Sequence, residues 1–183
     1  MSNMRVIPGS GEKVLLHTCC APCCAPSGER MMNDGYDITL FYSNSNIFPK
    51  KEYLKRLEEA RRLADIWNVA LIEDSWDHRE WLSFIKGFER EPEGGNRCKK
   101  CFEFNLRRTA QKAKEQGFPL YTTTLTLGPY KNSKMIFRIA EQFPGFLEYN
   151  FKKKDGFLRS IELSKEYNLY RQDYCGCEFS FRK

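Results

Sequence analysis

The chain has 183 residues, of which 41% are hydrophobic and 30% are charged, and its net charge of +6 is compatible with RNA as a partner. This length suffices for one domain with an apolar core, which we expect to span residues 1–183, and no apolar run approaches the roughly 18 residues of a membrane-spanning helix. The first residues, MSNMRVIPGSGEK, lack the apolar stretch of a secretory signal, so we expect a reducing, cytoplasmic location and no membrane partner.

Segments typical of strands alternate with segments typical of helices. In chain order we predict strand 13–18, helix 25–33, strand 36–44, helix 50–68, strand 68–74, a short helix within 76–88, helix 98–117, strand 119–127, helix 133–141, strand 146–152, helix 159–167 and an irregular tail. In the helix at 50–68, the pairs Glu52–Arg56 and Glu58–Arg62 have the spacing of ion pairs on a solvent-exposed face. The alternation predicts parallel βαβ units in a three-layer, mostly parallel α/β sheet.

Four cysteines follow the first predicted strand within LLHTCCAPCCAPSGE, residues 15–29: Cys19, Cys20, Cys23 and Cys24. In open parallel sheets this edge, the carboxyl end of the strands, is where ligands bind. A nucleotide-binding protein keeps glycines there, but neither GxGxxG nor GxxxxGK[ST] occurs in this sequence. Because a reducing compartment disfavours structural disulfides, eight cysteines indicate metal binding or redox chemistry.

A second thiol pair, Cys98 and Cys101, lies three residues apart at the start of a predicted helix, with Asn96 as the candidate N-cap. The spacing places both sulfurs on one helix face. The helix N-terminus and the basic neighbours, Arg97 among them, favour the thiolate form. A CxxC motif alone is weak evidence, so its meaning depends on the other cysteines.

All-thiolate ligation suits either zinc or an iron–sulfur cluster. The sequence has only two histidines, and we interpret His17 as a core or loop residue rather than a ligand. Adjacent cysteines fit one zinc tetrahedron poorly but can bind different irons of a cluster. We therefore favour a [4Fe–4S] cluster over zinc, with the ligands Cys19, Cys20, Cys98 and Cys101.

The remaining cysteines have separate interpretations. Cys23 lies at the open side of the cluster or binds an additional metal, and Cys24 is interpreted as a buried thiol at a helix start. Cys175 and Cys177 flank Gly176, so a disulfide between them closes a very small, strained and easily reduced ring. This favours a redox-active pair, although two further metal ligands remain an alternative.

Five segments of the sequence occur together, and in the same order, in one known family. They are HTCCAPC (17–23), FYSNSNIFPKKEY (41–53), RCKKCFEFNLRRTA (97–110), TTTLTLGPYK (122–131) and YRQDYCGCEFS (170–180). With them the chain resembles the cobalamin-independent epoxyqueuosine reductases over almost its whole length. The combination of HxCCAPC with YRQxYCGC is specific, whereas Cys24 departs from the family pattern, which has one cysteine after CCAP.

The resemblance implies the last step of queuosine biosynthesis, in which the epoxide of epoxyqueuosine in tRNA is reduced to a cyclopentene with loss of water. It also implies a Rossmann-like sheet similar to that of HUP and PP-loop proteins. The implied site is a [4Fe–4S] cluster on Cys19, Cys20, Cys98 and Cys101 and a redox-active disulfide at Cys175 and Cys177. An adjacent mononuclear iron is implied as well, with Cys23 and Asp173 as candidate ligands, and an unidentified electron donor is required.

Two other functions fit parts of this pattern. An iron–sulfur-dependent tRNA sulfur transferase would need ATP, for which the sequence lacks the glycine-rich loop. A zinc-stabilised RNA-binding module would use the same thiols without catalysis. The basic run FKKKDG, 151–156, has two interpretations, a solvated loop or a contact to RNA phosphates. Its aromatic neighbours are either core residues or residues that stack on bases.

Overall fold

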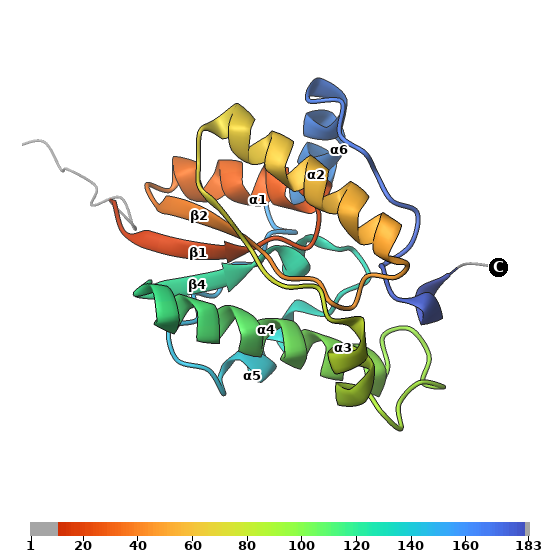
Figure 1. Ribbon diagram of the computed structural model, residues 1–183. Helices are drawn as coiled ribbons and strands as arrows, with labels where there is room; N and C mark the ends of the chain where they lie inside the picture. Colours follow the sequence, from red (N-terminus) through yellow and green to blue (C-terminus); the bar gives the residue numbers. More distant parts are fainter. Residues whose placement is uncertain (1–10, 182–183) are drawn as a thin grey trace, which may run out of the picture.

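A four-stranded, entirely parallel sheet forms the centre of the protein, as shown by the computed structural model, which describes residues 11–181 (Figure 1). The strands are β1 (Lys13–His17), β2 (Asp37–Tyr42), β3 (Leu71–Glu73) and β4 (Leu120–Thr123), and their order is β3-β2-β1-β4. The chain thus builds β1, β2 and β3 toward one side and then returns to place β4 on the other side of β1. The carboxyl ends of β1 and β4 therefore meet where the strand order reverses.

Helices cover both faces of the sheet. One layer contains α1 (Ala21–Asn33), α2 (Lys50–Trp67) and α6 (Gly156–Glu166), and the opposite layer contains α4 (Asn96–Gln116) and α5 (Ser133–Ala140) (Figure 1). The short helix α3 (His78–Phe84) packs on α4, and two 3-10 segments, η1 (Thr124–Leu127) and η2 (Glu178–Ser180), lie at the carboxyl edge. The predicted three-layer α/β class is confirmed.

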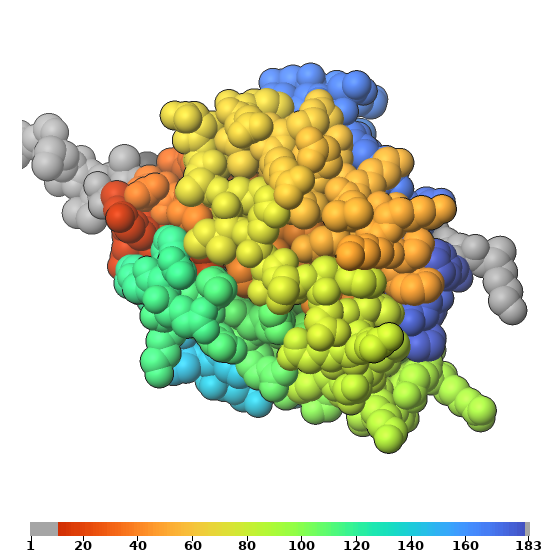
Figure 2. All heavy atoms as spheres, viewed as in Figure 1, coloured from red at the N-terminus to blue at the C-terminus, as the bar shows by residue number. Residues whose placement is uncertain are grey.

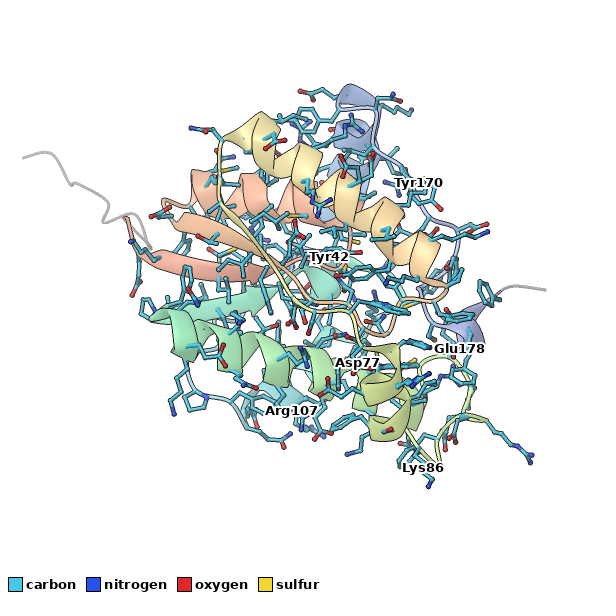
Figure 3. The ribbon with its side chains drawn as sticks, in the orientation of Figure 1. Tyr42, Asp77, Lys86, Arg107, Tyr170 and Glu178 are labelled. Atoms are coloured by element: carbon cyan, nitrogen blue, oxygen red, sulfur yellow. The ribbon has the colours of Figure 1, made fainter. Side chains whose placement is uncertain are left out.

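Each side of the sheet has its own apolar core. Val14 and Leu16 of β1 face α1 and α6, whereas Leu15 of the same strand faces α4 and α5, as the alternation of side chains along a strand requires. Tyr42 at the end of β2 is fully buried among the helices in the centre of the molecule (Figure 3). The space-filling view shows the outer surfaces of α2 and α4 separated by the segment that leads to α3 (Figure 2). None of the described helices combines the length and apolarity needed to cross a membrane.

Two predicted strands differ most from the structure, and the strand predicted at 68–74 is shortened to Leu71–Glu73. The strand predicted at 119–127 ends at Thr123, and its second half is the 3-10 turn η1. The strand predicted at 146–152 is wrong, since only an isolated bridge joins Phe146 to Tyr121. Beyond it, the Thr126 hydroxyl donates to the Tyr149 carbonyl oxygen at 2.7 Å, so a side chain replaces the backbone ladder that a fifth strand would need.

Helix α1 begins at Ala21, four residues before its predicted start. Pro22 in the first turn needs no hydrogen-bond partner for its nitrogen, which suits a helix start. Pro26 inside the helix has no N–H for the Pro22 carbonyl oxygen, but the Ser160 hydroxyl of α6 donates to that oxygen at 2.7 Å. Cys23 and Cys24 are therefore held by the first helical turn rather than by a loop.

Candidate active site

The thiols that follow β1 lie at the switch point of the sheet. The Cys19 N–H donates to the Thr124 hydroxyl oxygen at 3.1 Å, and that hydroxyl lies 3.2 Å from the Cys19 sulfur, so the residue after β4 holds the residues after β1. Ligands of parallel α/β sheets bind at such points. The predicted position of the cysteine block is confirmed.

His17, the last residue of β1, is a core residue and not a ligand. Its ring is fully buried, with Nδ1 2.9 Å from the Thr123 hydroxyl and Nε2 3.0 Å from the Ser43 carbonyl oxygen. Nε2 must carry the proton to donate to a carbonyl, which leaves Nδ1 as the acceptor. Burial lowers the pKa of His17, which keeps the ring neutral. Both nitrogens are thus occupied, and the sequence-based interpretation is confirmed.

Cys19, Cys20 and Cys23 form one compact group whose three sulfur atoms all lie within 4.8 Å of one another. The sulfurs of Cys19 and Cys20 are 3.9 Å apart. Hydrogen bonds from the other two thiols lower the pKa of Cys19. The bond to Cys19 raises the pKa of Cys20 to about 12, and the bonds to Cys19 and Cys20 raise that of Cys23 well above its ordinary value. The group therefore favours a single thiolate in the absence of a metal, and its three soft ligand atoms can bind a metal ion.

Cys24 does not belong to this group. It is fully buried on the core-facing side of α1, and the Thr18 hydroxyl donates to its sulfur at 3.4 Å. Burial raises the pKa of Cys24 to about 12, so the thiol is held protonated. The interpretation of Cys24 as a buried thiol is confirmed.

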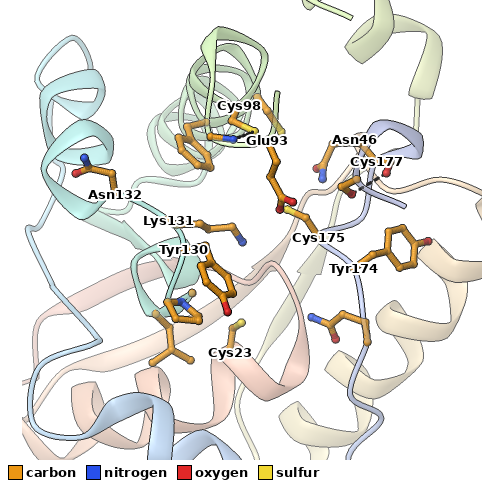
Figure 4. A pocket seen from close by; sticks show the side chains of 18 of the residues that line it. Cys23, Asn46, Glu93, Cys98, Tyr130, Lys131, Asn132, Tyr174, Cys175 and Cys177 are labelled. Atoms are coloured by element: carbon orange, nitrogen blue, oxygen red, sulfur yellow. Dashed lines mark hydrogen bonds between the residues drawn. The ribbon is translucent and has the colours of Figure 1, made fainter. Parts of the chain in front are cut away.

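A cavity of about 310 Å³ brings the three cysteine groups of the sequence together (Figure 4). Its lining includes Cys23 from the first group, Cys98 and Cys101 from the second, and Cys175 and Cys177 from the third. Cys19 and Cys20 join this site through their contacts with Cys23. Segments that are far apart in the sequence, from Cys23 to Cys177, thus line one cavity.

Cys98 and Cys101 lie in the first two turns of α4. The N–H of Gly94 donates to the Cys98 sulfur at 3.2 Å, and the Asn105 side-chain amide donates to the Cys101 sulfur at 3.8 Å. Burial nevertheless raises the pKa of both thiols, so the thiolates expected from the helix start need a bound cation.

The expected helix cap and basic neighbour have other roles. The N-cap of α4 is Gly95, and Asn96 is already helical, its backbone and side-chain N–H groups donating to the Glu91 carboxylate. A Cβ at Gly95 would lie 3.0 Å from the backbone carbonyl oxygen of Pro92, which makes a larger residue crowded there. Arg97 is buried and donates to the carbonyl oxygens of Glu89 and Glu91, so it orders the preceding loop rather than the thiols.

The third group lies on the C-terminal segment, where both thiols are free, Cys175 exposed and Cys177 buried. Gly176 between them has a φ of +146°, which L side chains rarely adopt. A Cβ there would also lie 3.1 Å from Cγ1 of Ile47. The N–H of Phe48 donates to the Gly176 carbonyl oxygen at 2.9 Å, which fixes this turn against the segment after β2.

Arg56 of α2 anchors the same segment. The sequence pattern places Arg56 on an exposed helix face, but the structure buries it. Its side chain is only 2% exposed and donates to the carbonyl oxygens of Cys175 at 2.9 Å and Tyr174 at 3.3 Å. The ion pair with Glu52, at 2.6 Å, is therefore buried rather than solvent-exposed as predicted. The predicted pair Glu58–Arg62 does not form, because Arg62 pairs with Glu59 instead.

Lys131 is a site residue that the sequence motifs contained but did not single out. Gly128, Pro129, Tyr130 and Lys131 form a turn closed by the Lys131 N–H and the Gly128 carbonyl oxygen at 3.0 Å. The turn leaves Tyr130 83% exposed at the cavity rim and directs Lys131 among the thiols (Figure 4). Burial alone would lower the pKa of Lys131, but nearby thiolate charge on the cysteines raises it, so the ammonium form persists.

The other predicted contacts lie at the edge of the site. Asp173 is exposed and lines the same cavity as Cys23. Within FKKKDG, the Lys152 ammonium group donates to the Lys131 carbonyl oxygen, so one lysine of the run supports the turn at 128–131. Tyr149 and Phe151 stack with ring centroids 5.2 Å apart as part of the core, whereas Phe157 lines the cavity.

Known proteins are similar to this chain over most of its length. Residues 14–183 match the family described as "Epoxyqueuosine reductase QueH". A protein of that name from Histophilus somni is 40% identical over 182 residues, covering 96% of this chain and 75% of the relative. The one from Acinetobacter baylyi is 39% identical over 191 residues, covering 100% and 88%, and the one from Thermotoga maritima is 37% identical over 175 residues, covering 91% and 89%.

Proposed function

The chain belongs to the epoxyqueuosine reductase QueH family, and we propose that it reduces the epoxide of epoxyqueuosine in tRNA to the cyclopentene of queuosine. The observation that supports this most strongly is the convergence of three separate thiol groups and the ammonium group of Lys131 on a single cavity. Removal of an epoxide oxygen needs two electrons and two protons, which thiols can supply, and a cation beside the oxygen favours cleavage of the C–O bond.

The redox balance fits the thiols of the C-terminal segment. Conversion of an epoxide to an alkene and water consumes two electrons and two protons. Oxidation of the Cys175 and Cys177 thiols to a disulfide releases the same two electrons and two protons. We propose this pair as the redox-active centre, with an external electron donor returning the disulfide to the dithiol after each turnover.

The remaining thiols fit a metal centre. Cys19, Cys20 and Cys23 lie within 4.8 Å of one another, both nitrogens of the neighbouring His17 are occupied, and burial keeps Cys98 and Cys101 protonated without a cation. We propose Cys19, Cys20, Cys98 and Cys101 as the ligands of a [4Fe–4S] cluster, and Cys23 with Asp173 as ligands of an adjacent iron. When bound, these groups supply single-electron transfer and polarisation of the epoxide oxygen.

The polar and aromatic residues of the turn at 128–131 have distinct roles in this proposal. The Lys131 ammonium group donates a hydrogen bond to the epoxide oxygen and stabilises the negative charge that develops as a C–O bond breaks. The exposed ring of Tyr130 at the rim stacks on a base that has been turned out of the tRNA anticodon. The free thiols suit the reducing conditions of the cytoplasm.

The test uses the anaerobically purified, reduced protein and tRNA that carries epoxyqueuosine. After incubation the tRNA is digested and its nucleosides are weighed, and we expect the modified nucleoside to lose one oxygen atom. Replacement of Cys175 or Cys177 by Ser should abolish this loss and leave the iron content unchanged. Unchanged nucleoside mass with the wild-type protein would refute the reductase, and loss of iron in these variants would make the two residues metal ligands.

The same preparation separates the alternatives. Iron with acid-labile sulfide supports the cluster, whereas one tightly bound zinc and no iron would support an RNA-binding module. Hydrolysis of ATP in the presence of tRNA would instead favour a sulfur transferase.

A further inference from the structure

A second hollow lies directly beside the thiol cavity. It has a volume of about 570 Å³ and runs between the first turns of α4 and helix α5. Asn132 and Met135 line both hollows, so the two are adjacent (Figure 4 shows Asn132 next to Lys131). We refer to this second hollow as the α4–α5 groove.

The α4–α5 groove is lined by four cationic side chains, Lys99, Lys100, Lys134 and Arg138, and by one carboxylate, Glu103. Glu103 pairs with Lys100 at 2.9 Å. Within residues 11–181, Lys99, Lys134 and Arg138 have no carboxylate at ion-pair distance, and Lys99 donates only to the Asn96 side-chain oxygen at 3.0 Å. The groove therefore concentrates positive charge that no acidic side chain of the described structure neutralises.

Some basic side chains elsewhere on the described surface are neutralised by carboxylates. Arg61 pairs with Glu73 at 2.7 Å, and Arg159 pairs with Glu29 at 2.6 Å. Other exposed cations, such as Lys114 and Lys165, also lack an ion pair within residues 11–181. The groove differs because three such cations lie around one hollow, beside the cavity that receives the reacting group. Arginine and lysine contacts to phosphate are the usual way in which proteins fix the position of a nucleic acid.

We propose that the α4–α5 groove binds the phosphodiester backbone of the RNA next to the nucleotide whose base enters the thiol cavity. This inference rests on the proposed function, because it takes RNA as the substrate. Lys99, Lys134 and Arg138 contact the phosphates, while the apolar side chains of Phe88, Met135 and Ile139 line the groove between them. The contacts act on charge alone, so they orient the RNA without reading its sequence.

The test measures RNA binding as a function of salt with the full chain, by fluorescence anisotropy of a labelled anticodon stem-loop. The variant Lys134→Gln/Arg138→Gln removes two groove cations. The control Lys114→Gln/Lys165→Gln removes two exposed lysines in the last turns of α4 and α6, outside the groove. Thermal unfolding of both variants verifies that each is folded.

Each phosphate contact contributes about 0.7–0.9 to the slope of log K against log[salt], so loss of two contacts should lower the slope by about 1.5. The electrostatic contribution of these contacts to the affinity vanishes near 1 M salt. Over the tenfold range down to ~0.1 M salt, a slope difference of about 1.5 corresponds to an affinity that is about 30-fold weaker in the variant. The control should bind like the wild type. Equal weakening in both variants, or an unchanged dissociation constant in the groove variant, would overturn the proposal.

Two further results separate this inference from other accounts. If the groove instead receives an acidic electron-donor protein, the groove variant should keep its RNA affinity and show a raised KM for the donor, which would overturn the RNA assignment. If the wild-type protein does not reduce epoxyqueuosine, the proposed function fails, while the salt dependence of RNA binding still decides the role of the groove.

Discussion

Replacement of Arg56 by Met tests whether the redox-active segment is held by one buried guanidinium group. The substitution keeps a long apolar stem but removes the donors to the carbonyl oxygens of Cys175 and Tyr174, and it leaves the Glu52 carboxylate without its cation. Because the Glu52 side chain is only 12% exposed, the substitution removes one partner of a largely buried ion pair. Such a removal costs about 3–5 kcal/mol. We expect the free energy of unfolding to fall by about that amount.

The control is Arg62→Met on the same helix. Arg62 is 41% exposed and also pairs with a glutamate and donates to one carbonyl oxygen, so its loss should cost less than about 1 kcal/mol. The double variant Glu52→Gln/Arg56→Met should recover about 1 kcal/mol or more of the loss, since no unpaired carboxylate remains.

The assays are urea denaturation for the free energy and amide hydrogen exchange for the location of the change. The Phe48 amide, which donates to the Gly176 carbonyl oxygen, should exchange faster in Arg56→Met and normally in Arg62→Met. Equal free-energy losses in the two variants, together with unchanged exchange at Phe48, would refute the anchoring role of Arg56.

Three more substitutions test other parts of the structure. Gly28→Ala places a Cβ 2.6 Å from the Trp67 ring and should lower the free energy of unfolding by about 1–3 kcal/mol; unchanged thermal stability would contradict this contact. Burial alone would raise the pKa of Asp74, but Arg108 and a hydroxyl hold it below its usual value, so its contribution to stability is present above the unfolded-state pKa of about 3.9 and is lost as pH falls. The deficit of Asp74→Asn in urea denaturation should therefore be full at neutral pH and shrink in acid, whereas a constant deficit would contradict the ion pair. Lys131→Met should lower kcat/KM by about 100-fold or more without loss of stability, and activity within about threefold of wild type would exclude its role at the epoxide oxygen.

The sequence predicted the class of the fold and the place of the thiols because both depend on local patterns. Alternating apolar strands and amphipathic helices require a parallel sheet, and the carboxyl ends of its strands meet at one edge. The cysteine block after β1 had to lie at that edge. The prediction of a fifth strand is wrong because it depends on a contact between distant residues. The Thr126 hydroxyl donates to the carbonyl oxygen of Tyr149, which lies 23 residues further along the chain.

The missed residues of the site share one property, since their roles depend on contacts between distant segments. Arg56 lies four residues after Glu52, a spacing that is also typical of exposed ion pairs. Only the packing of the C-terminal segment against α2 buries the Arg56 side chain. Lys131 follows a Gly-Pro pair, which is a turn signal, but the direction of its side chain depends on where β4 ends. A basic residue after a turn at the switch edge of the sheet is the signal that would have identified it.

The most direct test of the central claim is the stoichiometry of a single turnover. Reduced protein is mixed with excess epoxyqueuosine tRNA without any external electron donor, and both products are analysed by mass spectrometry. The dithiol account predicts that one disulfide forms between Cys175 and Cys177 for each oxygen atom removed from the nucleoside. Oxygen loss with both thiols still free would contradict it.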